Sequence, residues 1–239
     1  MASEPLRQGL GRQARRDIAL YDKCRRYTLA RETQAKGLYP YFREISRSED
    51  TEVTMEGRRR LMLGSNNYLG LAHHPRILEA ASRALVTYGS GCTGSRLLNG
   101  TLDLHLRLEA ELADFVGKED CLVFPTGYSA NLGLISGLAQ RGDTVYLDKF
   151  DHASIVDGAR LSLAETVRFR HGDVEALDRA LHERGGGSLV ICDGVYSMDG
   201  VILDVPRMVE VTRRHGAALA VDDAHALGVL GPGGEGTPA

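Results

Sequence analysis

The second half of the chain alternates short apolar runs with stretches of helical spacing. The runs are typical of β-strands and lie at residues 121–124, 143–148, 165–170, 188–194 and 218–223. A helical pattern lies between each neighbouring pair. Strands separated by helices of this length form right-handed βαβ units, so we expect an α/β fold with a mostly parallel sheet and helices on both faces.

The first 120 residues follow a different pattern. Residues 51–55 and 60–63 flank Gly57 and predict a short hairpin, and apolar residues spaced three and four apart over 77–88 predict an amphipathic helix. Before the hairpin, helical spacing continues until residues 37–40, where Gly37 and Pro40 interrupt it. We therefore expect two parts, an N-terminal helical arm over residues 1–50 and a large domain over residues 51–239.

Composition narrows the classes of function. The net charge of -3 and the absence of tryptophan disfavour a nucleic-acid surface, which would carry a basic stripe. No apolar run is long enough to predict a membrane span, and the first ten residues lack the apolar core of a secretory signal. We expect a cytoplasmic protein whose four scattered cysteines are free thiols.

The arm is locally basic, because arginines outnumber acidic residues between Arg7 and Lys36. Such a segment could attract an anionic partner, such as a phosphorylated acyl carrier or a membrane surface. The alternative, which we favour, is a solvated helical arm that packs across a subunit interface.

Residues 89–94, GSGCTG, spell the G-x-G-x-x-G pattern of dinucleotide-binding turns. That pattern indicates such a site only where a strand precedes the glycines and a helix follows them. Here a helical pattern precedes them, and residues 95–100 separate them from the next helix. The sequence therefore does not predict a nicotinamide dinucleotide site.

Ligands of parallel α/β sheets bind beyond the carboxyl ends of the strands. After the first apolar run, Thr126, Gly127 and Ser129 open a helix with small and hydroxyl-bearing residues, which is typical of a phosphate-binding helix N-terminus. Simple capping of the helix by Thr126 is the alternative. His152 follows the second run, where a histidine could serve chemistry or only structure.

Acidic residues follow the last two runs. Asp193 and Asp199 lack the further oxygen ligands of a calcium loop, and Asp222 with His225 lacks a third ligand for a transition metal, so we expect no metal site. Strand alternation places Asp222 on the face of two small alanines, which leaves room for a flat ligand. A carboxylate in that position can pair with a protonated pyridine nitrogen.

Six stretches, in this order, resemble signatures of the α-oxoamine synthases. These are fold-type I pyridoxal-phosphate enzymes that condense an amino acid with an acyl-CoA, and the resemblance runs from residue 39 to the end of the chain. The stretches are SNNYLGLA (65–72), GSGCTGSRLLNGTLDLH (89–105), PTGYSAN (125–131), DHASIVDGAR (151–160), DGVYSMDG (193–200) and VDDAHALGVLGPGGEG (221–236).

The resemblance implies a pyridoxal 5'-phosphate site. The amides of Gly127 and Tyr128, near Thr126, would hold the cofactor phosphate. His152 would stack on the pyridine ring and help to orient the substrate carboxylate, and Asp222 would pair with the pyridinium.

The resemblance implies further contacts. His225 and Ser197 would hydrogen-bond the phenolic oxygen of the cofactor, and Asn66 would lie near the substrate carboxylate. Thr93 and Ser95 belong to a glycine-rich loop that, in the family, approaches the active site of the neighbouring subunit, which implies a homodimer with shared active sites.

The implied reaction is a decarboxylative condensation that gives an amino ketone, CoA and CO2. Residues 39–45, 52–71 and 92–105 look closest to the branch that uses serine and a long-chain acyl-CoA. The branches that use alanine with pimeloyl-CoA, or glycine, are the alternatives.

The resemblance also bears on how much of an enzyme is present. The family places its cofactor-binding lysine on a strand after the one that ends at Asp222, and the lysines of this chain all precede that strand: Lys23, Lys36, Lys118 and Lys149. We therefore expect the front part of an enzyme, inactive by itself. A non-catalytic subunit that supports a competent partner is the alternative.

Overall fold

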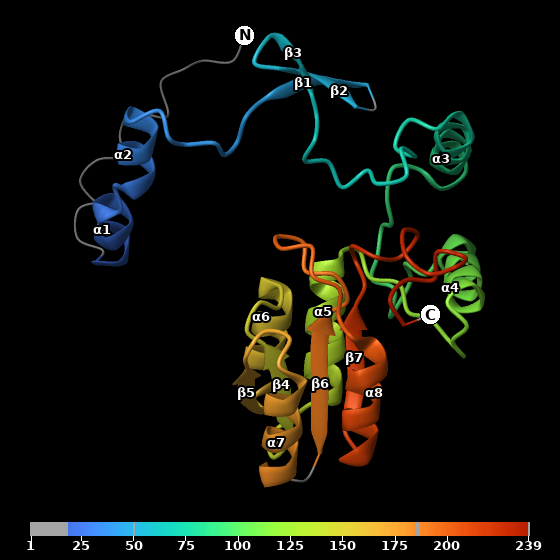
Figure 1. Cartoon of the computed structure of the whole chain (residues 1–239). Coiled ribbons are helices and arrows are strands. Elements are labelled where there is room, and N and C mark those ends of the chain that lie inside the picture. The colour runs from blue at the N-terminus through green and yellow to red at the C-terminus, as the bar shows by residue number, and fades with distance from the viewer. Residues whose placement is uncertain (1–18, 50, 185–186, 239) are drawn as a thin grey trace. The chain divides into compact units, whose positions relative to one another are not determined.

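A computed structural model describes residues 19–49, 51–184 and 187–238 of the chain (Figure 1). The chain divides into two compact units, of which the first ends at Leu63 and the second begins at Gly64. Each unit is described by itself. None of the helices in the described ranges combines the length and the apolar character needed to cross a bilayer.

The first unit contains two short helices and a small antiparallel sheet. The helices are α1 (Ala19–Arg26) and α2 (Leu29–Ala35), and the strands are β1 (Ile45–Glu49), β2 (Glu52–Met55) and β3 (Arg58–Leu61), paired in that order. Glu56 and Gly57 form the two-residue turn of the predicted hairpin, and both have positive φ, as a type I′ turn requires. The sequence did not predict β1. β1 pairs with β2, so the small sheet contains strands from both sides of the boundary that we expected between the arm and the large domain.

The second unit is built on a four-stranded parallel sheet. Its strands are β4 (Thr144–Asp148), β5 (Glu165–Phe169), β6 (Ser188–Asp193) and β7 (Ala218–Asp222), in the order β5-β4-β6-β7. Its helices are α3 (Pro75–Tyr88), α4 (Asp103–Phe115), α5 (Gly127–Leu138), α6 (Ala153–Ser162), α7 (Val174–Arg184) and α8 (Val205–Arg214).

Helices cover both faces of this sheet, which confirms the predicted fold class (Figure 1). Along β4, Val145 and Leu147 pack into the core under α5 and α6, whereas Tyr146 packs into the core under α7 and α8. All three side chains are fully buried. This two-sided burial explains why β4 and β6 are continuous apolar runs rather than alternating ones.

The close contact between α5 and α6 depends on Gly158. A Cβ at this position would lie 2.8 Å from Cδ1 of Ile135 and 3.0 Å from the carbonyl oxygen of Asn131, both on α5. The absence of a side chain therefore lets the two helices approach closely at this point.

The predicted strand at residues 121–124 is wrong, because this segment pairs with no strand among the described residues. Its backbone groups form hydrogen bonds with side chains instead. The N–H of Val123 donates to Glu109 Oε1 at 2.8 Å, and its carbonyl oxygen accepts from Arg96 Nη1 at 3.1 Å. Arg96 and Glu109 also form a two-pronged ion pair, which holds the pKa of Glu109 at about 2.

The core between the sheet and α6 gives a direct test of this packing. Ile155 is fully buried on α6, so Ile155→Ala should lower the free energy of unfolding by about 2–5 kcal/mol, because it removes apolar contacts and leaves a cavity. Leu161 on the same helix is 58% exposed, so Leu161→Ala should change it by about 0.5 kcal/mol or less. Urea unfolding of the full-length protein measures both, and equal effects would contradict the packing.

Candidate active site

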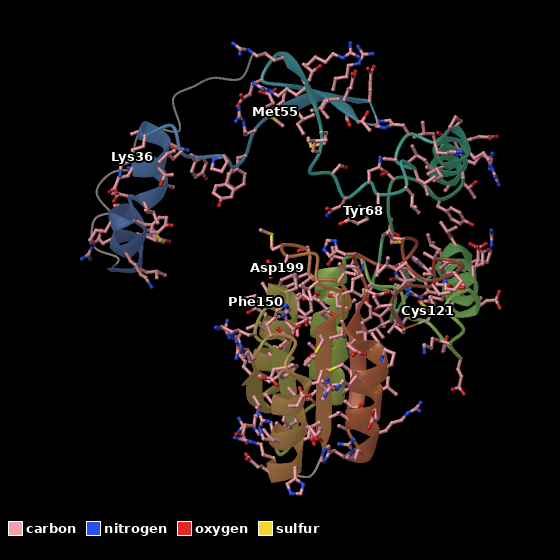
Figure 2. The ribbon with its side chains drawn as sticks, in the orientation of Figure 1. Lys36, Met55, Tyr68, Cys121, Phe150 and Asp199 are labelled. Carbon is pink, nitrogen blue, oxygen red and sulfur yellow. The ribbon has the colours of Figure 1, made fainter. Side chains whose placement is uncertain are left out.

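A pocket of about 560 Å³ opens at the carboxyl ends of β4, β6 and β7. Six of the residues singled out in the sequence line it: Gly127, Tyr128, His152, Ser197, Asp222 and His225. Phe150 and Asp199, which also line it, mark the loops that follow β4 and β6 in Figure 2. The pocket lies where the parallel topology predicts a ligand site.

The N-terminus of α5 forms one wall of the pocket. Thr126 caps this helix, because its Oγ1 accepts from the N–H of Ser129 at 3.0 Å and lies 2.8 Å from the Ser129 hydroxyl. The capping interpretation is therefore correct, and it does not exclude anion binding. Gly127 and Tyr128 begin the helix at its positive end, where backbone amides favour a negatively charged ligand.

Asp222 ends β7 and is held by two donors. Its Oδ2 accepts from Nδ2 of Asn131 at 2.7 Å, and its Oδ1 accepts from the N–H of Ala224 at 3.1 Å. Ala220 packs against the core under α5 and α6, so Asp222, two residues later, lies on the same face, as strand alternation predicts. Both hydrogen bonds are to neutral donors, so the carboxylate keeps its capacity to pair with a cationic ligand.

His152 caps the N-terminus of α6 with its own ring. Its Nδ1 accepts from the N–H of Ser154 at 3.2 Å and lies 2.7 Å from the Ser154 hydroxyl. The residue is exposed and lines the pocket. The histidine thus has a structural role at the helix start, and its ring remains accessible to a ligand.

Two buried acids connect the ends of β4 and β6. The N–H of Asp193 donates to Oδ1 of Asp151 at 3.2 Å, and the N–H of His152 donates to Oδ2 of Asp193 at 2.8 Å. Asp151 also accepts from the N–H of Asp148 at 2.7 Å. This exchange of hydrogen bonds fixes the backbone on which His152 stands, and it gives Asp193 a structural explanation that needs no metal.

Burial changes the ionisation of these acids. Burial, together with the neighbouring charges of Asp193 and Asp148, raises the pKa of Asp151 to about 8. Burial likewise raises the pKa of Asp193 to about 6, with a contribution from the charge of Asp222.

Tyr68 contacts a residue of the site, although the sequence did not predict a role for it. Its hydroxyl lies 2.6 Å from Nδ1 of His225 and 3.4 Å from Oδ1 of Asn66. Asn66 does not line the pocket, and Tyr68 is its connection to His225. The clue in the sequence was the position of Tyr68 within the signature at residues 65–72.

Thr93 and Ser95 do not line this pocket. The carbonyl oxygen of Ser95 accepts from the N–H groups of Leu98, Asn99 and Gly100, which folds the segment into a tight turn. A Cβ at Gly100 would lie 1.9 Å from the carbonyl oxygen of Gly94, so close backbone packing explains the glycine at position 100. A contribution of these residues to a neighbouring subunit stays a prediction.

Comparison with known proteins identifies the family. Residues 59–236 match the family model of aminotransferase class I and II. The chain belongs to this family. Among curated relatives, the serine palmitoyltransferase of Sphingobacterium spiritivorum is 49% identical over 220 residues, which cover 91% of this chain and 55% of the relative. The 8-amino-7-oxononanoate synthase of Geobacter sulfurreducens is 49% identical over 204 residues, which cover 84% of this chain and 52% of the relative.

Solved structures of this aminotransferase family agree. Sphingomonas wittichii serine palmitoyltransferase has a TM-score of 0.86 and 43% identity, over 92% of this chain and 55% of that one. A variant of the S. paucimobilis enzyme, with a bound PLP–myriocin aldimine, has a TM-score of 0.87 and 40% identity, over 92% and 56%. The chain spans about half the length of these relatives. They confirm the resemblance to α-oxoamine synthases.

The buried acids predict a pH dependence of stability. An acid whose pKa is higher in the folded protein than its usual value near 4 binds its proton more tightly when folded, so its contribution to stability is complete at low pH. That contribution is lost as the pH rises from about 4 to about 8, at up to ~1.4 kcal/mol per pH unit for one proton. Asp151→Asn should therefore flatten the decline in the free energy of unfolding over this range.

Asp199→Asn is the matched control, because Asp199 is exposed at the rim of the same pocket. It should leave the slope unchanged. Urea unfolding at a series of pH values measures the slopes, and an Asp151→Asn slope equal to that of the unmodified protein would contradict the assignment.

Proposed function

We propose that this chain forms the cofactor-binding part of a pyridoxal-phosphate enzyme that condenses an amino acid with an acyl-CoA and releases CO2. The amino acid that we propose is serine, and the acyl group is a long chain. The observation that carries the proposal is the single pocket in which the helix N-terminus at Gly127, the ring of His152, the carboxylate of Asp222 and the imidazole of His225 meet.

The donor set of this pocket suits each part of pyridoxal phosphate. The phosphate matches the amides of Gly127 and Tyr128 at the start of α5, next to the capping hydroxyl of Thr126. The aromatic ring matches the imidazole of His152, and a volume of about 560 Å³ lies within the range of small-molecule sites. Asp222 supplies a carboxylate for the pyridine nitrogen.

The charge of Asp222 is central to the proposed chemistry. When bound, pyridoxal phosphate supplies an electron-withdrawing ring that stabilises a carbanion at the α-carbon of the amino acid. Asp222 keeps the pyridine nitrogen protonated, and its two neutral donors, Asn131 and Ala224, leave its negative charge uncompensated for that purpose.

The other residues bind and orient. His225 and Ser197 hydrogen-bond the phenolic oxygen of the cofactor, and the hydroxyl of Tyr68 holds the imidazole of His225 in place. With substrate bound, Asn66 would lie near the substrate carboxylate, although it does not line the pocket in this structure. In a homodimer, Thr93 and Ser95 contribute to the pocket of the neighbouring subunit.

The choice of serine and a long-chain acyl-CoA is supported by the relatives named serine palmitoyltransferase, one of which matches 91% of this chain at 49% identity. A second candidate is the condensation of alanine with pimeloyl-CoA. It is supported by the relatives named 8-amino-7-oxononanoate synthase, one of which is also 49% identical, over 84% of the chain. Both proposals concern the full-length protein that the gene encodes.

Asp222→Asn in the full-length protein should lower kcat by about 100-fold or more, which corresponds to roughly 2.7 kcal/mol of transition-state stabilisation. A neutral amide cannot keep the pyridine nitrogen protonated. CoA release measures turnover, and unchanged urea unfolding shows that the fold is intact. Activity close to that of the unmodified protein would refute the role of Asp222.

A substrate panel decides between the two candidates. The full-length protein is incubated with palmitoyl-CoA or pimeloyl-CoA and with serine, alanine or glycine, and CoA release is measured for each pair. We expect the highest kcat/KM with serine and palmitoyl-CoA. A preference for alanine with pimeloyl-CoA would establish the second candidate, and no CoA release with any pair would overturn both.

A further inference from the structure

One amide group links the two sides of the pocket. Nδ2 of Asn131, on α5, donates to Oδ2 of Asp222 at 2.7 Å and to Oγ of Ser154 at 2.9 Å. Asn131 is 8% exposed and Ser154 is 1% exposed. Asn131 therefore uses both of its side-chain N–H groups inside the protein, one on the end of β7 and one on the first turn of α6.

The chemistry of these groups fixes the direction of each hydrogen bond. A carboxylate only accepts, so the nitrogen end of the Asn131 amide must face Asp222. Ser154 Oγ accepts from that same nitrogen, which leaves its own proton to donate to Nδ1 of His152 at 2.7 Å. The backbone N–H of Ser154 donates to the same Nδ1 at 3.2 Å.

Nδ1 of His152 therefore accepts two hydrogen bonds, and the proton of the neutral imidazole lies on Nε2. Because Nδ1 is occupied within the protein, Nε2–H is the donor that the ring can offer to a ligand in the pocket. A substrate carboxylate is an acceptor of the matching kind.

The packing of the two helices makes this chain of hydrogen bonds possible. Gly158 lies one turn after Ser154 on α6, and it allows α6 to approach the backbone of Asn131 on α5. The serine hydroxyl is thereby held within reach of the amide. Asn131 and Ser154 are both buried, so the link between Asp222 and His152 runs through the core.

We propose that Asn131 is a positioning residue that couples Asp222 to His152, holding the carboxylate directly and, through Ser154, fixing the imidazole with its proton on Nε2. The significance of this coupling for catalysis rests on the proposed function. The hydrogen-bond relay itself is a property of the protein without cofactor or substrate.

NMR of the cofactor-free, full-length protein with ¹⁵N-labelled histidine tests the relay directly. The His152 signal is assigned by its loss in His152→Phe. We expect the unmodified protein to carry the proton on Nε2. Ser154→Ala keeps the backbone N–H that donates to Nδ1 at 3.2 Å, so this variant, like Asn131→Leu, should raise the population of the Nδ1–H tautomer without making it dominant.

Ser162→Ala is the matched control, because Ser162 is also buried on α6 but its hydroxyl donates to the carbonyl oxygen of Ala159. It should leave the tautomer unchanged. A proton on Nδ1 in the unmodified protein, or an unchanged tautomer in Ser154→Ala, would overturn the proposal. Ser154→Ala decides the matter even where Asn131→Leu fails to fold.

Kinetics test the link to the reaction. Ser154→Ala should raise KM for the amino acid about fivefold, the equivalent of one net hydrogen bond, and change kcat less than about twofold. In a His152→Phe background, which keeps an aromatic ring but has no Nδ1, Ser154→Ala should have no further effect. An undiminished effect in that background would show that Ser154 acts by another route and would overturn the coupling.

The NMR and the activity measurements distinguish failure of the hydrogen-bond relay from failure of the proposed function. If the unmodified protein neither binds pyridoxal phosphate nor releases CoA, the proposed function fails while the NMR experiment still decides the relay. If the protein is active and the tautomer does not respond to Ser154→Ala, the relay fails and the proposed function stands.

Discussion

Parallel pairing of β4, β6 and β7 is the constraint on which the site depends, because it brings three carboxyl strand ends to one edge of the sheet. Acidic residues stand at or just after these ends, among them Asp151, Asp193 and Asp222. Such a concentration of negative charge in a largely buried place is unfavourable unless donors compensate it. Backbone amides serve Asp151 and Asp193, and the side chain of Asn131 serves Asp222.

These acids differ in their hydrogen-bond donors and therefore in their roles. Asp151 and Asp193 accept from the backbone of each other's loops, and burial raises the pKa of both. They join the strands and support His152. Asp222 stands at the pocket and is held by neutral groups, so it is the carboxylate that a cationic ligand would meet. One edge of the sheet thus combines structural acids with one carboxylate that faces the pocket.

Much of this arrangement follows from sequence patterns. The apolar runs that became β4 to β7 are long enough, and well enough separated by helical spacing, to specify a parallel sheet without further information. The rule that ligands bind beyond strand ends then selects His152 and Asp222. The strand predicted at residues 121–124 was wrong, because the sequence of this run does not show that the side chains of Arg96 and Glu109 hydrogen-bond the backbone of Val123.

The contacts that join distant segments could not be predicted in this way. Tyr68 meets His225 across 157 positions of sequence, and Asn131 meets Asp222 across 91. Neither pair produces a periodic pattern in the sequence, since each contact depends on how a loop or helix packs against the sheet. The signature at residues 125–131 contains Asn131, but only the packing of α5 against α6 shows what its amide does.

In the proposed function, the pocket beyond β4, β6 and β7 holds pyridoxal phosphate in a defined orientation. A crystal structure of the full-length protein grown with pyridoxal phosphate tests it most directly. We predict the pyridine nitrogen within about 3 Å of the Asp222 carboxylate and the phosphate at similar distances from the first amides of α5. Density for the cofactor elsewhere, or with its phosphate at Asp222, would refute this placement of pyridoxal phosphate.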